Sequence, residues 1–260
     1  MQGFILQDLF VRIEIETLDG FPEVSSGDDV AHLIVESSQF NDIRHCDGDI
    51  LVIAQKIISK AESRLVSLSD IEPSERAEAL ASETNKDPRL VELILSESDG
   101  VIRHKRDVLI VAHKLGLVHA NAGIDQSNIA GEDQALLLPV APDVSAARIR
   151  SSLEEKYGVR LGVIIADSMG RAWRRGTVGT AIGAAGVEIF QDLKGQPDRY
   201  GRNLETTEVG MGDQLAAAAS LVIGQAAEGT PVAIIRGLDI SSDKQSAADL
   251  LRPIAEDLFR

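Results

Sequence analysis

The sequence predicts an α+β fold, of mixed α/β character, in which helices cover mixed sheets. Short apolar runs such as Ile50–Ala54 and Val163–Ala166 stand next to Gly and Asp residues, which is typical of buried strands. Stretches rich in Ala, Leu and Glu with helical spacing lie between such runs. Strands and helices alternate without a regular βαβ rhythm, and several neighbouring strands are close enough for hairpins. This favours an α+β fold over a doubly wound sheet.

The elements expected in the first hundred residues follow from this patterning. A loop at Asp19–Asp29 is rich in turn residues and ends in residues that cap helices. Around it the patterns predict, in chain order, a strand Phe10–Glu16, a helix from Val30 to Phe40, a strand Ile50–Ala54 followed by a polar crossing, a strand Arg64–Leu68, and helices Ser74–Thr84 and Pro88–Ser96.

The second part of the chain begins with residues 107–125, which the pattern predicts as strands and turns. There follow a strand Ala135–Leu138, a helix Ala146–Tyr157 with Gly158 as its C-terminal cap, a strand Val163–Ala166, a further strand before an Ala-rich helix Asp213–Ala227, a strand Val232–Ile235 and an amphipathic helix Ser246–Phe259.

Composition limits the classes of function. With 260 residues, of which 44% are hydrophobic, the chain can bury a substantial core in one large or two small domains. Its 41 acidic and 26 basic residues give a formal net charge of -15, which argues against general nucleic-acid binding. An anionic small ligand must therefore be held by local cations or by a metal ion.

The chain has no feature that directs it to a membrane or an oxidising compartment. Its single cysteine, Cys46, cannot form an internal disulfide. The first twenty residues carry several charges, and no apolar run reaches the roughly 18 residues that a membrane helix needs. We expect a cytoplasmic protein.

Nucleotide-binding fingerprints are weak. The chain has no G-x-x-x-x-G-K-[ST] motif, which excludes an ordinary P-loop. Gly210 and Gly212 half-match a dinucleotide-binding turn, but Leu215 stands where the third glycine belongs. A tight strand–helix turn capped by Asp213 explains the same residues better.

Two segments present oxygen atoms suited to a metal ion. In "HANAGIDQSN" the side chains of Asn121, Asp125, Ser127 and Asn128 form a short arc, and hard divalent cations prefer such oxygens. The alternative is a turn rich in Asn and Asp that binds nothing. The pair Asp167-Ser168, at the end of a predicted strand, supplies a second carboxylate.

Several cations could hold phosphate or carboxylate oxygens. Arg171, Arg174 and Arg175 follow Asp167 closely, and guanidinium groups bind such oxygens bidentately; the alternative is a solvated basic loop. Lys56 and Lys60 share a face if their segment is helical, but they could equally be surface lysines. His113 and His119 have no partner at a zinc-site spacing, and we expect hydrogen-bonded structural histidines.

Taken in order, the motifs resemble those of the coenzyme F420:L-glutamate ligase family. They are "GDILVIAQKIISKAESR", "HANAGIDQSN", "LLLPVAPDVSAARIR", "VIIADSMGRAWRRG", "AIGAAGV" and the segment from Tyr200 to Leu238. The resemblance implies a GTP-dependent ligase that adds L-glutamate to the carboxylate of the deazaflavin coenzyme precursor F420-0, with later residues joined through γ-linkages. It also implies Mg²⁺ or Mn²⁺, as two ions, and leaves a role for K⁺ open.

The resemblance further implies a two-domain homodimer of mixed α/β character. We expect a discontinuous core domain, 1–90 plus 200–260, and an inserted domain, 91–199, that carries the metal-binding carboxylates. The matching metal ligands are Asp125, Asp167, Ser168 and Gln225. The matching GTP-contacting positions are Phe21, Pro22, Glu23, Val24, Gln55, Lys56, Lys60, Asn128, Ile223, Gly224, Gln225, Ala226, Ala227, Glu228, Gly229 and Thr230. Together with the two aspartates, Arg171 and Arg174 are predicted catalytic residues, and their assignment rests on their charge.

The chain departs from the family pattern after Gly176. Family members commonly carry Gln-Thr-Asp before the Ala-Ile-Gly that begins here at Ala181, and this chain lacks that Asp. Thr commonly stands where this chain has Ser168. Two alternatives therefore stay open: a related ligase for another amino acid or acid acceptor, and a non-catalytic protein that binds metal or nucleotide.

Overall fold

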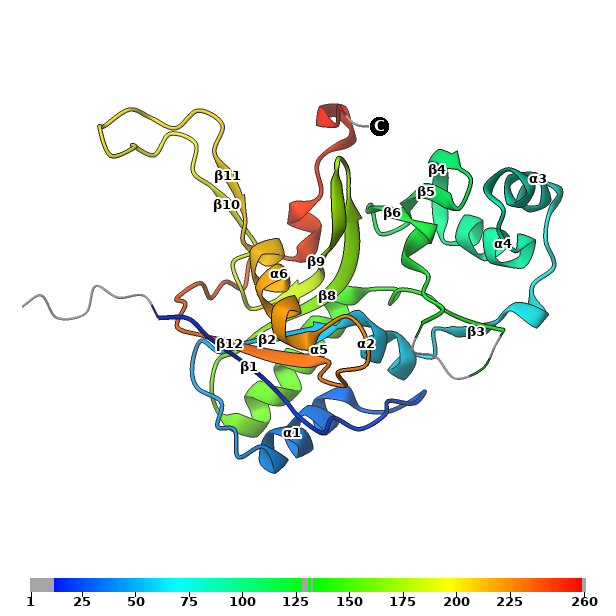
Figure 1. Cartoon of the computed structure of the whole chain (residues 1–260). Helices are drawn as coiled ribbons and strands as arrows, with labels where there is room; N and C mark the ends of the chain where they lie inside the picture. Colours follow the sequence, from blue (N-terminus) through cyan, green and yellow to red (C-terminus); the bar gives the residue numbers. More distant parts are fainter. Residues whose placement is uncertain (1–11, 128–130, 132, 259–260) are drawn as a thin grey trace, which may run out of the picture.

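A five-stranded sheet lies at the centre of the fold, in the order β1-β12-β2-β8-β9 (Figure 1). The computed structural model describes residues 12–127, 131 and 133–258. The strands are β1 (Glu14–Thr17), β2 (Ile50–Ala54), β8 (Gly162–Arg171), β9 (Arg174–Ala185) and β12 (Val232–Arg236). Strands β2 and β8 are parallel, and the other neighbours are antiparallel. The predicted α+β class with mixed sheets is confirmed.

Helices cover both faces of this sheet, and the strands supply apolar side chains to each. In β2, Leu51 and Ile53 join one core, with α1 (Val30–Phe40), α2 (Gln55–Ala61) and α5 (Pro142–Tyr157). Ile50 and Val52 point the other way, into a core shared with α6 (Met211–Ile223). Alternating side chains of a strand face opposite sides, so a run of five apolar residues suits a strand buried on both faces.

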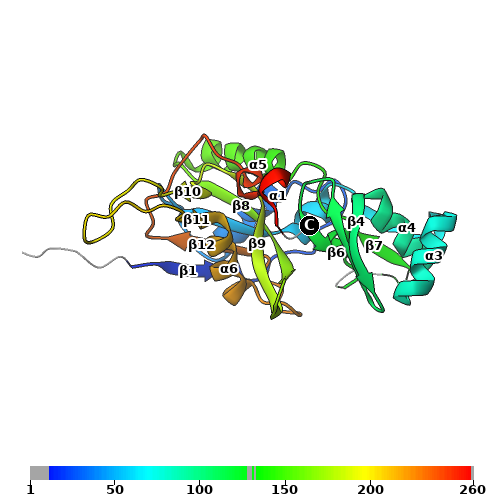
Figure 2. The ribbon, with the colours of Figure 1, turned by 90° about the horizontal axis from the view of Figure 1, so that it is seen from above.

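Smaller sheets surround the central one. Helices α3 (Glu75–Thr84) and α4 (Pro88–Ser96) pack on a three-stranded sheet of β4 (Ser98–Lys105), β5 (Val108–His113) and β6 (Val118–Ala120), at one end of the molecule (Figures 1 and 2). Strands β3 (Leu65–Ser67) and β7 (Gln134–Leu136) form a pair, as do β10 (Phe190–Asp192) and β11 (Glu208–Gly210), from which a long hairpin projects.

The predicted domain boundaries and the homodimer stay predictions. The strand order joins β8 and β9, from the range 91–199, to β1, β2 and β12, from the ranges 1–90 and 200–260.

Helix positions agree best with the sequence where a cap is present. Helix α1 begins after Asp29, whose carboxylate accepts the N–H groups of Ala31 and His32. Helix α5 ends at Gly158, which adopts a left-handed conformation, as the sequence predicts. In the part of the chain that the structure describes, no helix is long and apolar enough to cross a lipid bilayer.

Several sequence predictions are wrong. Instead of a helix over residues 246–259, the described part of this segment has two short 3₁₀ turns, Ala247–Leu250 and Ile254–Glu256, because Pro253 cannot donate to a continuing helix. Helix α6 ends at Ile223 rather than at Ala227. Asp213 does not cap α6; its carboxylate turns to strand β9 and accepts the N–H of Ala181.

The sequence patterns also missed helix α2 and strand β9. Helix α2 occupies the segment expected as a polar crossing. Strand β9 is rich in Gly and Ala, which carry little strand signal.

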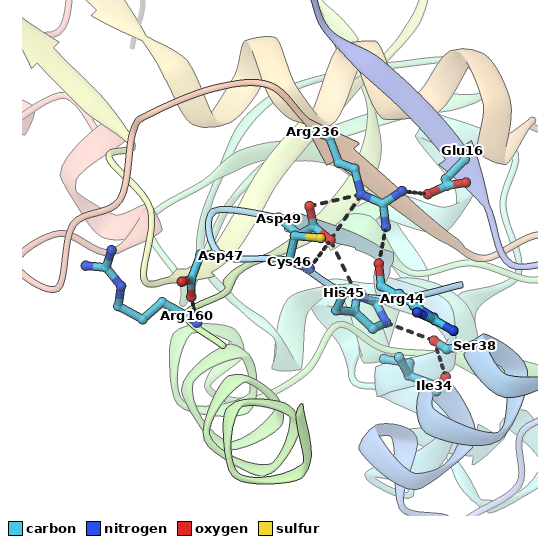
Figure 3. Close-up of polar contacts among 10 residues, drawn as sticks. All are labelled: Glu16, Ile34, Ser38, Arg44, His45, Cys46, Asp47, Asp49, Arg160 and Arg236. Carbon is cyan, nitrogen blue, oxygen red and sulfur yellow. Dashed lines mark hydrogen bonds and ion pairs between the residues drawn. The ribbon is translucent and has the colours of Figure 1, made fainter. Parts of the chain in front are cut away.

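A buried ion pair secures the amino end of β2 (Figure 3). The carboxylate of Asp49, which is 2% exposed, accepts two bonds from Nε of Arg236 at 3.0 and 3.1 Å and one from the N–H of Cys46. The Ser38 hydroxyl donates to Ile34 O, so it must accept from Nε2 of His45. Nδ1 of His45 lies 3.8 Å from Asp49 and has no hydrogen-bond partner among the described residues. Burial lowers the pKa of His45, although Asp49 acts in the opposite direction.

Candidate active site

A cavity of about 440 Å³ lies beside the carboxyl end of β2 and the middle of β8. Ala54, the last residue of β2, is in register with Ala166 of β8, so the start of α2 lies beside Asp167 and Ser168. The sequence predicted that the strand before Asp167 ends at Ala166, but β8 continues to Arg171 and includes both residues. The predicted site residues that line the cavity are Phe21, Glu23, Gln55, Lys56, Lys60, Asp125, Asp167, Ser168, Ile223, Gly224, Gln225, Ala226, Ala227, Glu228, Gly229 and Thr230. Segments far apart in the sequence therefore converge on one cavity.

Asp125 is held by donors on both oxygens. Its Oδ2 lies 2.6 Å from Nζ of Lys56, and its Oδ1 accepts the N–H and the hydroxyl of Ser127, each at 2.7 Å. Lys56 also donates to the Ser127 hydroxyl at 3.0 Å. Burial raises the pKa of Asp125, but the bonds from Lys56 and Ser127 more than offset this and hold its pKa below the ordinary value. Asp125 is therefore an anion in neutral solution.

Asp167 is paired with His119 of strand β6. Its Oδ2 lies 3.0 Å from Nε2 of His119, while Nδ1 of the same ring lies 2.8 Å from the carbonyl oxygen of Ala120. Both partners are acceptors, so both ring nitrogens carry protons and His119 is a cation in this arrangement. Burial acts to lower the pKa of His119, but Asp167 and the Ala120 carbonyl raise it above its ordinary value.

Sequence reasoning placed His119 among structural histidines and missed its contact with a predicted site carboxylate. The ring is hydrogen-bonded, as expected, but its partner lies 48 residues away. No local spacing could have signalled this pair. His113 is buried and its Nδ1 accepts the N–H of Leu115 at 2.9 Å, as expected of a structural histidine, although its Nε2 has no hydrogen-bond partner among the described residues.

The remaining lining residues add oxygen atoms and a second ammonium group. The Ser168 hydroxyl donates to Oε1 of Gln225 at 2.7 Å. Nζ of Lys60 lies 2.5 Å from Oε1 of Glu23. Glu228 accepts the N–H of Ala226 and so ties the segment after α6 into a compact loop.

Some predicted residues lie elsewhere. Pro22 is not among the lining residues, and Val24, 4% exposed, packs into the core. Arg171 and Arg174 are exposed, and they stand opposite each other in the strand register at the turn between β8 and β9. Arg171 stands four positions further along β8 than Asp167, roughly 13 Å at 3.3 Å per residue. Asn128 lies outside the described residues.

The donor atoms at the cavity suit a hard divalent cation. Asp125, Asp167, Ser168 and Gln225 all line it, and each offers an oxygen atom. Carboxylate, hydroxyl and amide oxygens match Mg²⁺ and Mn²⁺ rather than softer metals. Within the described ranges, His, Cys, Asp and Glu form no group of three or more that could hold a metal ion. A cation here would therefore depend on the hydroxyl and amide oxygens, and on ligand oxygens, besides the two aspartates.

Comparison with known proteins gives a consistent result. Residues 20–237 match the family model described as F420-0:Gamma-glutamyl ligase. The chain is 47% identical to the coenzyme F420:L-glutamate ligase of Methanothermobacter thermautotrophicus over 95% of this chain and 99% of that protein. It is 46% identical to the protein of the same name from Methanopyrus kandleri, over 96% and 98%, and 40% identical to that of Archaeoglobus fulgidus, over 96% and 97%.

Proposed function

The chain belongs to the F420-0:gamma-glutamyl ligase family, and from this membership and the cavity we propose that it is a GTP-dependent ligase. It joins L-glutamate to the carboxylate of coenzyme F420-0 and then adds further glutamates through γ-linkages. The observation that carries the proposal is the convergence of Asp125, Asp167, Lys56 and Lys60 on one cavity. Two carboxylates for cations beside two ammonium groups for phosphate are what phosphoryl transfer requires.

The proposed reaction has two steps. A carboxylate oxygen of the acceptor attacks the γ-phosphorus of GTP, and the bond from that phosphorus to the β-γ bridging oxygen breaks, which gives an acyl phosphate and GDP. The amine of glutamate then attacks the acyl carbon, the carbon–oxygen bond to phosphate breaks, and the departing phosphate takes up the amine proton. Activation is needed because a free carboxylate resists attack by an amine.

The chain's own residues have distinct parts in these steps. Lys56 and Lys60 bind phosphate oxygens through the N–H groups that Asp125, Ser127 and Glu23 leave free. Asp125 and Asp167, with Ser168 and Gln225, hold Mg²⁺ or Mn²⁺. When bound, such ions would neutralise charge on the phosphate oxygens. Arg171 and Arg174 lie too far along the hairpin to touch the reacting phosphate from the same chain, so they bind acidic groups at the distal part of the acceptor.

The test is incubation of the purified protein with F420-0, GTP, L-glutamate and either Mg²⁺ or Mn²⁺. Mass spectrometry should show products heavier by one or more glutamyl units, together with GDP. Asp125→Asn and Asp167→Asn should abolish product, whereas exposed Asp239→Asn should not. Absence of glutamylated product with either metal would refute the proposal. Nucleotide or metal binding without turnover would then indicate a non-catalytic protein.

A second candidate is a related ligase with another acceptor or amino acid. The observation that favours it is the position of the segment that departs from the family pattern. Gly179 pairs with Ser168 and Thr180 pairs with Asp167, so the altered residues stand directly beside the site. A panel of acids and amino acids, scored by GDP release, separates the two candidates.

The proposal also includes a homodimeric assembly and a requirement for a metal ion. A homodimer should give twice the 27.9 kDa chain mass in light scattering. Mg²⁺, Mn²⁺ and K⁺ can be compared in the same activity assay.

A further inference from the structure

The pairing of His119 with Asp167 joins two sheets at the cavity. His119 lies on β6, at the side of the peripheral sheet that faces β8 and β9 (Figures 1 and 2). The side chains of His119 and Asp167 are 10% and 12% exposed. Because little water reaches this pair, its hydrogen bond fixes the carboxylate more firmly than a surface contact would.

The bond also determines which oxygen of Asp167 is available. Oδ2 is engaged by His119, whereas Oδ1 accepts no hydrogen bond from any residue in the described ranges. Asp125 differs, because Lys56 and Ser127 engage both of its oxygens. Of the four carboxylate oxygens on the two aspartates, Oδ1 of Asp167 is therefore the one that a cation can approach without competing with a hydrogen-bond donor among the described residues.

We propose that His119 is a positioning residue, which holds the carboxylate of Asp167 so that Oδ1 is presented to a divalent cation. This goes beyond the metal-ligand set of the proposed function and rests on it, because His119 acts only through Asp167. His119 itself is no metal ligand, since both of its ring nitrogens face acceptors. Hydrogen-bond partners of metal ligands commonly contribute about 10- to 100-fold in metal affinity.

The experiment measures Mn²⁺ binding to the full chain by electron paramagnetic resonance, without GTP, acceptor or glutamate. His119→Ala should weaken Mn²⁺ binding about 10-fold or more. His119→Gln, whose amide N–H₂ can still donate to Asp167, should restore most of the affinity. His104→Gln is the matched control: His104, on β4 of the peripheral sheet, pairs with exposed Glu83 of α3, and its replacement should leave Mn²⁺ binding unchanged. Circular dichroism establishes whether each variant is folded, and His119→Gln decides the outcome if His119→Ala is not.

Two results overturn the inference without touching the proposed function. One is wild-type Mn²⁺ affinity in folded His119→Ala. The other is an equal loss in the Ala and Gln variants, which would indicate a general structural role. Failure of the wild-type protein to bind Mn²⁺, even with GTP present, would overturn both this inference and the metal dependence of the proposed function.

Discussion

Gly179 lets helix α6 approach strand β9 closely enough to form one wall of the cavity. A Cβ atom at this position would lie 2.6 Å from the carbonyl carbon of Ala216 and closer still to its oxygen, whereas ordinary contact begins at 3.4 Å. Gly179→Ala must therefore push α6 away by roughly 1 Å. Forced overpacking of this kind typically costs about 1–3 kcal/mol. For a chain of this size, a cost of about 2 kcal/mol lowers Tm by roughly 4–8 °C.

The displacement of α6 should also change the shape of the cavity, because Ala216 and the end of α6 line it. Differential scanning calorimetry measures the change in Tm, and calorimetric titration with GTP and Mg²⁺ measures the loss of affinity. Gly170→Ala is the matched control: it lies on the paired strand, and nothing stands within 4 Å of its added Cβ. If Gly179→Ala melts with the wild-type protein and binds GTP equally well, close packing of α6 does not shape this cavity.

Three other changes test the electrostatics of the fold and the site. Asp49→Asn should lower the free energy of unfolding by about 3 kcal/mol in urea denaturation, because it removes the buried carboxylate that faces Arg236 and leaves only the more exposed Glu16, whereas exposed Asp47→Asn should change it little. Because the pKa of His45 is lowered in the folded state, the unfolded chain binds the proton first as pH falls through about 6.5. Stability should therefore decrease below that pH, and urea denaturation at two pH values should show a smaller decrease in His45→Gln. Lys56→Met should raise the pKa of Asp125, measured by carboxyl ¹³C NMR, and an unchanged value would show that the ammonium group does not control it.

Local patterns predicted the elements but not their partners. The apolar run of β2 between Asp49 and Gln55 identifies a buried strand, and Asp29 and Gly158 mark helix ends through their own side chain or backbone. More than a hundred residues separate β2 from β8 in the sequence, so no local pattern could predict that the two strands pair.

The same holds for the candidate site: the sequence predicted its carboxylates but not the residues that contact them. Asp125 and Asp167 could be proposed as site residues because each belongs to a recognisable motif. The partners that set their charge state could not. From the sequence, Lys56 could equally have been a surface lysine, and His119 had no partner at a zinc-site spacing. Both assignments required the tertiary contacts of the folded chain.

The charges at the cavity give a final prediction, on the order of ligand binding. Lys56, Lys60 and His119 carry three positive charges, and they face the carboxylates of Asp125, Asp167, Glu23 and Glu228, so the balance is one negative charge before any ligand enters. A nucleoside triphosphate brings about four more negative charges into a chain whose own net charge is -15. Without added cations, the cavity repels it. GTP should therefore bind poorly in calorimetric titrations with EDTA and at least 10-fold more tightly with Mn²⁺. Equal affinity in both conditions would show that Lys56 and Lys60 hold the triphosphate alone, and that the aspartates have another purpose.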